Sequence, residues 1–200
     1  MLRRTMMAAP SGPPPAGYTT LSSTDKSGNV ALSGGNLVAT GTVNGSGIAR
    51  SIATITGKKY FEGVFTDSVG NGAVIAVGVA TSAHGLATSL GYANPQGWAF
   101  WGSNVGARHN GATVIAQVGG DGATLGFAVD KDAGKLWIRD SNGVWMQGDP
   151  VAGTSPLWSN LTGNLYAAAC PWANGTIVSM QFDPAGFKFP APAGFSPMTS

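Results

Sequence analysis

Hydrophobic residues alternate with small or polar residues in short runs along this chain, a pattern that predicts β-strands. The clearest unit spans residues 119–145. Within it Leu125, Phe127 and Val129 alternate with small residues, and a turn-forming stretch at 130–134 leads into a second extended run. The unit therefore predicts a β-hairpin with one face directed toward a core.

Similar runs recur from about residue 19 onward, and turns rich in glycine or asparagine separate most of them. No stretch shows convincing helical periodicity. Many short strands without helices predict an all-β fold, an antiparallel β-sandwich. The predicted strands are 36–42, 48–56, 59–67, 74–81, 97–101, 113–118, 124–130, 135–139, 165–169 and 177–182. The predicted core residues are Tyr60, Trp98, Phe127, Val129 and Leu136.

The composition favours the same fold class. Glycine accounts for 31 of the 200 residues, about twice its usual share of roughly 7%. Charged residues make up only 10% of the chain, against roughly 25% in ordinary proteins. Glutamate, a strong helix former, occurs once, as Glu62. Short strands joined by tight turns fit this composition better than helices do.

The chain is predicted to divide into an N-terminal arm, 1–17, and one domain, 18–200. Four prolines within 10–17 favour an extended polyproline II spacer without a core of its own. The head that precedes the spacer combines apolar and basic side chains, which suit docking on another protein; a frayed terminus is the alternative. The candidate anchoring residues are Leu2, Arg3, Arg4, Met6 and Met7.

Charge and hydropathy argue against two classes of partner. The net charge is +2 and no dense basic run occurs, so nucleic-acid binding is not expected. No apolar stretch approaches the roughly 20 residues that span a bilayer, and no signal peptide is recognisable, so no membrane insertion is expected. The single cysteine, Cys170, cannot form an internal disulfide and is expected to be a buried structural thiol.

The usual signatures of catalysis and metal binding are missing. His84 and His109 lack the spacing of a zinc site. Asp130 and Asp132 resemble the opening of a calcium loop, but Ser141 stands where a bidentate glutamate is needed, so a hairpin turn is expected there. The sequence contains neither a nucleophile elbow nor a complete phosphate-binding glycine motif. We therefore expect no enzyme activity, no metal and no cofactor.

Aromatic residues remain as candidate binding groups. Strand alternation directs Trp98 and Phe100 to one face and Trp101 to the other. Tryptophans beside turns can stack on a sugar or hold a protein partner, although packing beneath a loop is the alternative for each of them. The candidate ligand-binding residues are Trp101, Arg108, His109, Trp145, Trp158 and Trp172.

Several segments, in order, resemble the SPRY family from about residue 19 to 198. The similar segments are GKKYFE at 57–62, AVGV at 76–79, GWAFWG at 97–102, RHNG at 108–111, LGFAVD at 125–130, GKLWI at 134–138, LYAA at 165–168 and FKFPAPAGF at 187–195. Two departures are Gly63, where the family usually has valine, and the small residues Gly122 and Ala123 after Asp121. The resemblance places Glu62 in the family's opening strand.

The resemblance implies a concanavalin-type jelly roll that binds ligands through loops at one end and performs no catalysis. The opening segment and GGNLVAT at 34–40 look most like SPRY domains of bacteriophage and prophage virion proteins. We therefore expect a virion structural protein, a tail fibre or capsid decoration protein, made in the host cytoplasm without a signal peptide and displayed on the outer surface of the virion.

The expected partners are other virion proteins, contacted through the arm, and a host-surface glycan or protein. Copies are expected to form a trimer or another symmetric cluster. Two alternatives remain open at this stage. One is a stand-alone protein-binding adaptor, and the other is a carbohydrate-active enzyme on a lectin-like sandwich.

Overall fold

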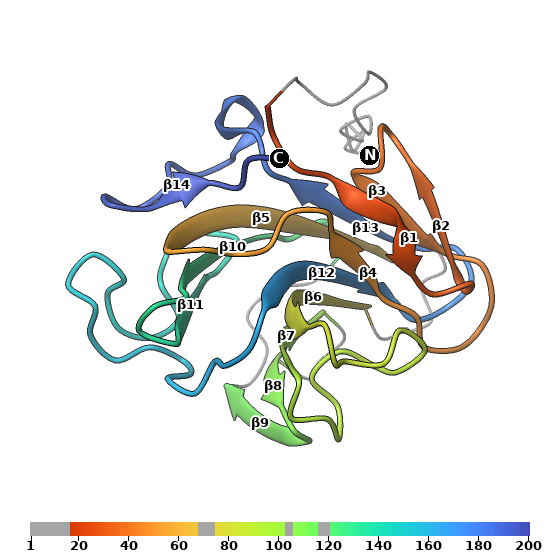
Figure 1. The fold of residues 1–200 in the computed structure, drawn as a ribbon, viewed down its shortest axis with the longest axis horizontal. Helices are drawn as coiled ribbons and strands as arrows, with labels where there is room; N and C mark the ends of the chain where they lie inside the picture. Colours follow the sequence, from red (N-terminus) through yellow and green to blue (C-terminus); the bar gives the residue numbers. More distant parts are fainter. Residues whose placement is uncertain (1–16, 68–74, 103–105, 116–120) are drawn as a thin grey trace, which may run out of the picture.

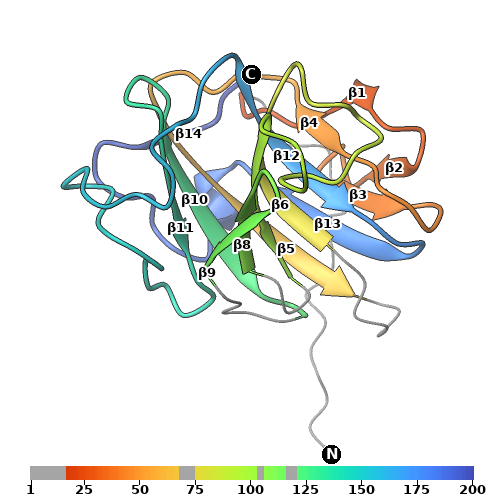
Figure 2. The same ribbon diagram turned by 90° about the horizontal axis from the view of Figure 1, so that it is seen from below.

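The computed structural model describes residues 17–67, 75–102, 106–115 and 121–200, and it folds as two β-sheets packed face to face (Figures 1 and 2). The main strand pairings are antiparallel, and the short β14 alone among the named strands pairs in parallel, with β5. Among the described residues the helical element is one 3₁₀ turn, η1 (Pro184–Gly186). The predicted all-β antiparallel sandwich is confirmed.

The first sheet interleaves strands from distant parts of the sequence. Its order is β1 (Leu21–Lys26), β4 (Ala49–Ser51), β12 (Leu165–Pro171), β6 (Ile75–Thr81), β7 (Gly97–Trp101), β8 (Gly106–His109) and β9 (Ala112–Ile115). Strand β12, from the C-terminal part, therefore lies between β4 and β6 (Figure 2). The first sheet therefore contains strands from both the N-terminal and the C-terminal parts of the domain.

The second sheet is built around the long strand β5. Its order is β11 (Lys135–Arg139), β10 (Thr124–Asp130), β5 (Lys58–Asp67), β13 (Thr176–Gln181), β3 (Val38–Gly41) and β2 (Val30–Ser33), with β14 (Ser196–Pro197) beside β5. The bridge between Tyr18 and Thr199 brings the beginning and the end of the domain together.

The predicted hairpin is present as β10 and β11, with the predicted bounds. Phe127 pairs with Ile138, and Asp130 pairs with Lys135 at the turn. The Asp130 carboxylate accepts a hydrogen bond from the Ala133 amide at 3.0 Å. This acidic side chain therefore stabilises the turn, as expected from the sequence.

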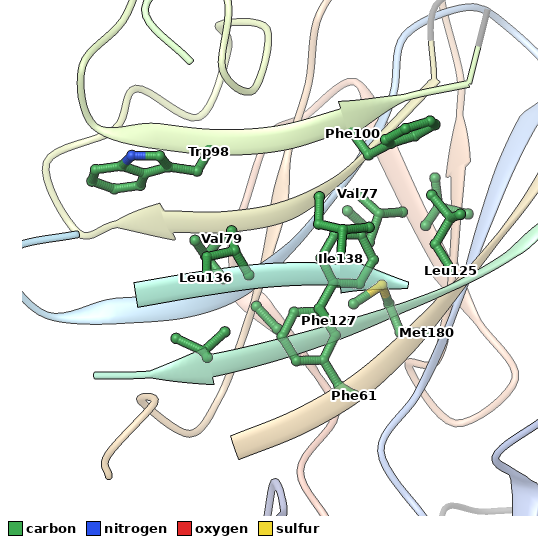
Figure 3. Close-up of a cluster of buried hydrophobic side chains, with 14 of the residues drawn as sticks. Phe61, Val77, Val79, Trp98, Phe100, Leu125, Phe127, Leu136, Ile138 and Met180 are labelled. Atoms are coloured by element: carbon green, nitrogen blue, oxygen red, sulfur yellow. The ribbon is translucent and has the colours of Figure 1, made fainter. Parts of the chain in front are cut away.

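The main core lies between the sheets (Figure 3). The rings of Phe61 and Phe127 stack at 5.1 Å with an interplanar angle of 6°. Val77 and Phe100 of the first sheet belong to the same buried cluster. All five predicted core residues are buried, but Tyr60 lies on the outer face of the second sheet, in a separate cluster with Trp137.

Each sheet is also covered on its outer face. On the first sheet, Leu90 of the loop 82–96 packs against Trp101. On the second sheet, Phe195 of the C-terminal segment packs against Trp137. Trp98 and Phe100 point into the main core while Trp101 points outward, which confirms the predicted alternation.

The sequence-based strands differ from the structure in two ways. The predicted strand 48–56 is shorter in the structure, where β4 spans Ala49–Ser51 and the side chain of Ile52 is 61% exposed. Strands β1, β2, β8 and the two-residue β14 are not among the predicted strands. Polar residues dominate β1, and Arg108 and His109 interrupt the hydrophobic alternation in β8, so neither strand has a clear period-two pattern.

Candidate binding surface

The loop 82–96 and the β8–β9 turn meet on the outer face of the first sheet. The Gly111 amide of the turn donates to the Gly91 carbonyl of the loop at 3.3 Å, and the Thr81 amide donates to the Gln96 carbonyl at 2.9 Å. These contacts hold the loop against the strands that carry three of the candidate residues: Trp101, Arg108 and His109.

Arg108 joins two aromatic rings into one cluster. Its guanidinium carbon lies 4.9 Å from the ring centroid of Trp101 and 4.9 Å from that of Tyr92. Trp101 is 5% exposed and its indole N–H donates to the Leu90 carbonyl at 2.7 Å, whereas Tyr92 is 51% exposed. Trp101 is therefore a buried support, and Tyr92 and the half-buried Arg108 form the accessible part of the cluster.

Arg108 has no anionic partner within the described part of the chain. No carboxylate oxygen there lies within 4 Å of its guanidinium. Its Nη2 donates to the Gly111 carbonyl at 3.2 Å, while its Nε is buried without a hydrogen-bond partner. Ring faces stabilise such a cation by about 0.5–2 kcal/mol, less than a hydrogen-bonded carboxylate would in a desolvated site. The arrangement thus leaves a positioned positive charge that an anionic ligand group can complement.

His109 belongs to a neighbouring network on the inner face. Its ring stacks on Trp98 at 4.7 Å with an interplanar angle of 3°. The Trp98 indole N–H donates to Oδ1 of Asn160 at 3.0 Å, and the Asn160 Nδ2 donates to Nε2 of His109 at 3.3 Å. Since the Gly97 carbonyl 2.9 Å away can only accept, Nδ1 of His109 carries the proton. His109 thus holds the Asn160 loop in place.

Arg50 attaches the start of the loop 82–96 to the sheet. This side chain is 5% exposed, and its Nε and Nη2 bind both oxygens of Asp25 at 2.8 and 2.7 Å. Its Nη1 donates to the carbonyls of Thr81 and His84. Because four hydrogen bonds fix its guanidinium between Asp25 and the loop carbonyls, Arg50 orients the loop that carries Tyr92.

The other candidate tryptophans do not join this surface. Trp145 is half-buried over the second sheet, 4.2 Å from the Arg139 guanidinium. Trp158 is 7% exposed and packs in the main core, so little of its ring is accessible to a ligand. Trp172 is half-buried just after β12, where its carbonyl accepts a hydrogen bond from the Gly45 amide. The anchoring candidates Leu2, Arg3, Arg4, Met6 and Met7 lie outside the described residues.

Sequence reasoning missed Tyr92 and Asn160. Both lie in irregular segments, and neither belongs to a motif whose spacing points to its partner. Only the juxtaposition of the loops with β7 and β8 reveals their contacts.

Reactive groups do not gather near this surface. Within the described residues no cluster of three or more His, Cys, Asp or Glu side chains could hold a metal ion. The same residues contain no helix that is long and apolar enough to cross a membrane. Cys170 is fully buried, and burial raises the pKa of its thiol to about 11. Such a thiol is a packing group, in agreement with the expectation for Cys170.

Comparisons with known proteins identify the fold. No protein-family model and no curated protein sequence matches the chain. The SPRY domain of human HERC1 matches with a TM-score of 0.65 at 13% identity, over 80% of this chain and 96% of that one. The PSpry domain of TRIM65 matches with a TM-score of 0.61 at 15% identity, over 83% and 93% of the two chains.

A third solved structure, stonustoxin, matches with a TM-score of 0.60 at 20% identity. The match covers 82% of this chain but 27% of the longer toxin chain. At these identities the likeness establishes a SPRY-like fold and leaves function to be argued from the surface.

Proposed function

We propose that this protein is a non-enzymatic binding module whose ligand is a protein or peptide that docks on Tyr92, Arg108 and the loops around them. The observation that carries the proposal is the guanidinium of Arg108, which has no carboxylate partner among the described residues and lies between an exposed tyrosine ring and a buried tryptophan ring. SPRY-like neighbours support a protein-binding role at the level of the fold.

The chemistry of the cluster indicates the kind of ligand. Tyrosine and arginine are enriched among residues that dominate protein interfaces, because a large ring or a planar fork buries much area with little loss of conformational freedom. Arg108 is positioned before binding by Trp101 and by the Gly111 carbonyl. A ligand that presents a carboxylate beside an apolar side chain would satisfy both accessible groups.

The biological setting that we propose follows from the sequence. The short basic and apolar head, the proline spacer and the resemblance to phage SPRY domains support a bacteriophage virion protein, of the tail-fibre or capsid-decoration type. In this proposal the arm binds other virion proteins, copies cluster as a trimer or similar symmetric group, and the sandwich faces outward. Its ligand would then be a protein of the host surface.

Peptide selection tests the binding surface directly. Peptides from a random displayed library would be selected on the wild-type protein, and their affinities would be measured for Tyr92→Ala and Arg108→Gln. We expect selected peptides to be rich in Asp or Glu and to lose at least tenfold in affinity with either variant, about 1.4 kcal/mol. Val144→Ala, at a side chain 62% exposed next to Trp145, is the matched control. Selected peptides that bind both variants as well as the wild type would contradict the proposal.

Association of the protein with virus particles tests the proposed role as a virion protein. The protein should be found in purified virions, and a chain lacking residues 1–17 should fold but fail to join them. Assembly of the truncated chain at the wild-type level would show that attachment runs through the sandwich instead.

A further inference from the structure

We infer that the loop 82–96 is an acid-released element, in which uptake of a proton at His84 opens the loop and withdraws Tyr92 from the binding surface. The effect on ligand binding rests on the proposed function. The opening itself is a property of the fold and can be measured without any ligand.

His84 is buried with one ring nitrogen hydrogen-bonded and the other without a hydrogen-bond partner. Its side chain is 2% exposed, and Nδ1 donates to the Gly85 carbonyl at 2.9 Å. Since a carbonyl only accepts, Nδ1 carries the single proton of the neutral ring. The other nitrogen, Nε2, is buried without a hydrogen-bond partner. A proton placed there would create a buried positive charge with no carboxylate within 4 Å among the described residues.

The buried ring of His84 packs between the start of β7 and its own loop. Its Cδ2 lies against Gly97 at the start of β7, so closely that a methyl group at Gly97 would come within 2.9 Å of it. Thr88 of the same loop lies on the opposite side of the ring edge, with Oγ1 3.4 Å from Nδ1. Protonation therefore has to be accommodated by displacement of the loop itself.

The charged groups around His84 disfavour the added charge. Arg50 on β4 donates to the His84 carbonyl at 3.2 Å, and its own counter-ion is Asp25 on β1. Cys170 on β12, in the hydrophobic cluster beneath the loop, is a neutral thiol. Within the described chain no carboxylate lies within 4 Å of the imidazole. Burial and the positive charge of Arg50 lower the pKa of His84, against opposing hydrogen bonds with the Gly85 and Ser89 backbones.

Individual hydrogen bonds attach the loop 82–96 to the rest of the domain. Besides the bonds from Arg50, the Trp101 indole donates to the Leu90 carbonyl and the Ile48 amide donates to the Leu86 carbonyl. The Gly111 and Thr81 amides donate to the Gly91 and Gln96 carbonyls, and the Ser46 hydroxyl bonds the Ser89 hydroxyl. Tyr92 lies two residues after Leu90. An opening that frees His84 therefore also displaces the segment that positions Tyr92 over Arg108.

The direction of the pH dependence follows from linkage. The closed loop holds His84 with a lowered pKa, and the open loop exposes it to water, so the open form binds more protons. Closure is then fully stable above the ordinary histidine pKa of about 6.5 and weakens below it. The opening equilibrium should rise about tenfold for each pH unit below that value, until the pKa of the closed form is reached.

Hydrogen exchange of the wild-type protein between pH 8 and pH 5 tests the opening. Exchange of amides in 82–96, corrected for the intrinsic pH dependence, should accelerate below pH 6.5, while the core strand β10 stays protected. The acceleration should disappear in His84→Gln and persist in His109→Gln, which removes the other histidine of the chain. A corrected exchange rate in the wild type that does not change with pH would overturn the inference, whether or not the variants fold. Unchanged acceleration in His84→Gln would overturn it as well.

A second measurement separates this inference from the proposed function. Peptides selected at pH 8 should bind at least tenfold more weakly at pH 5.5 to the wild type, but not to His84→Gln. If the loop opens in acid while the affinity stays constant, the ligand binds elsewhere, and the proposed surface is wrong although the acid release stands. If the affinity falls while the loop stays closed, the acid release is wrong.

Discussion

Replacing Glu62 by glutamine tests whether one buried carboxylate holds the C-terminal segment on the second sheet. Glu62 is 1% exposed and accepts three hydrogen bonds. Its Oε1 accepts from the Tyr60 hydroxyl at 2.8 Å and from the Phe189 amide at 3.0 Å, and its Oε2 accepts from the Lys188 amide at 2.7 Å. Glutamine has the same shape, but one of its two terminal atoms is a donor instead of an acceptor.

The expected loss in the free energy of unfolding follows from these three hydrogen bonds. The best orientation of the amide keeps Oε1 in place and turns the NH₂ group toward the Lys188 amide, which leaves that buried donor unpaired at about 1–3 kcal/mol. The two remaining bonds change from a charged to a neutral acceptor and weaken by about 1 kcal/mol each. Relief from burying a charge offsets part of this loss. We therefore expect Glu62→Gln to lower the free energy of unfolding by about 2–4 kcal/mol.

Urea unfolding, followed by tryptophan fluorescence, measures the change. With a slope of about 2 kcal/mol per molar urea, the midpoint should fall by about 1–2 M. Tyr60→Phe is the matched control, because it removes one donor and leaves the carboxylate with both backbone amides; it should lose only about 1 kcal/mol. The amides of Lys188 and Phe189 should also exchange faster in Glu62→Gln. A midpoint within about 0.3 M of the wild type, with both amides still protected, would refute the reasoning.

Three further predictions concern the core and the thiol. Phe127→Ala removes a ring stacked on Phe61 and should lower the free energy of unfolding by about 2–5 kcal/mol; an unchanged urea midpoint would contradict this. Gly78→Ala should prevent normal folding, since the added methyl would collide with the Trp98 carbonyl on β7, and a native circular-dichroism spectrum would argue against that packing. Cys170 should resist a thiol reagent at pH 8 and react once urea unfolds the chain, since burial raises its pKa to about 11; rapid reaction of the native protein would contradict its burial.

The local pattern of the sequence is enough to predict those strands whose side chains alternate strictly. The hairpin of β10 and β11 has the predicted bounds, and the opposite orientations of Trp98 and Trp101 follow from a period of two residues. These features depend on neighbours a few residues apart, so sterics and turn chemistry decide them locally. The pattern did not predict strands β1 and β8, because polar residues interrupt their alternation. Pairing with neighbouring strands holds both of them in the first sheet.

The candidate site depends on contacts that local pattern does not encode. Alternation could place Trp101 on a strand, but it did not predict β8, which carries Arg108. The partner of Arg108 is Tyr92, which comes from an irregular loop, and the partner of His109 is Asn160, 51 residues away. Resemblance to a family located Glu62 in its strand, yet its partners at Lys188 and Phe189 were not predictable from that strand. The sequence alone thus determined the fold class and most strands, because these arise from short-range periodicity. The tertiary structure decided which loops meet and which charges lack a partner, because packing the two sheets together is what brings residues so distant in the chain into contact.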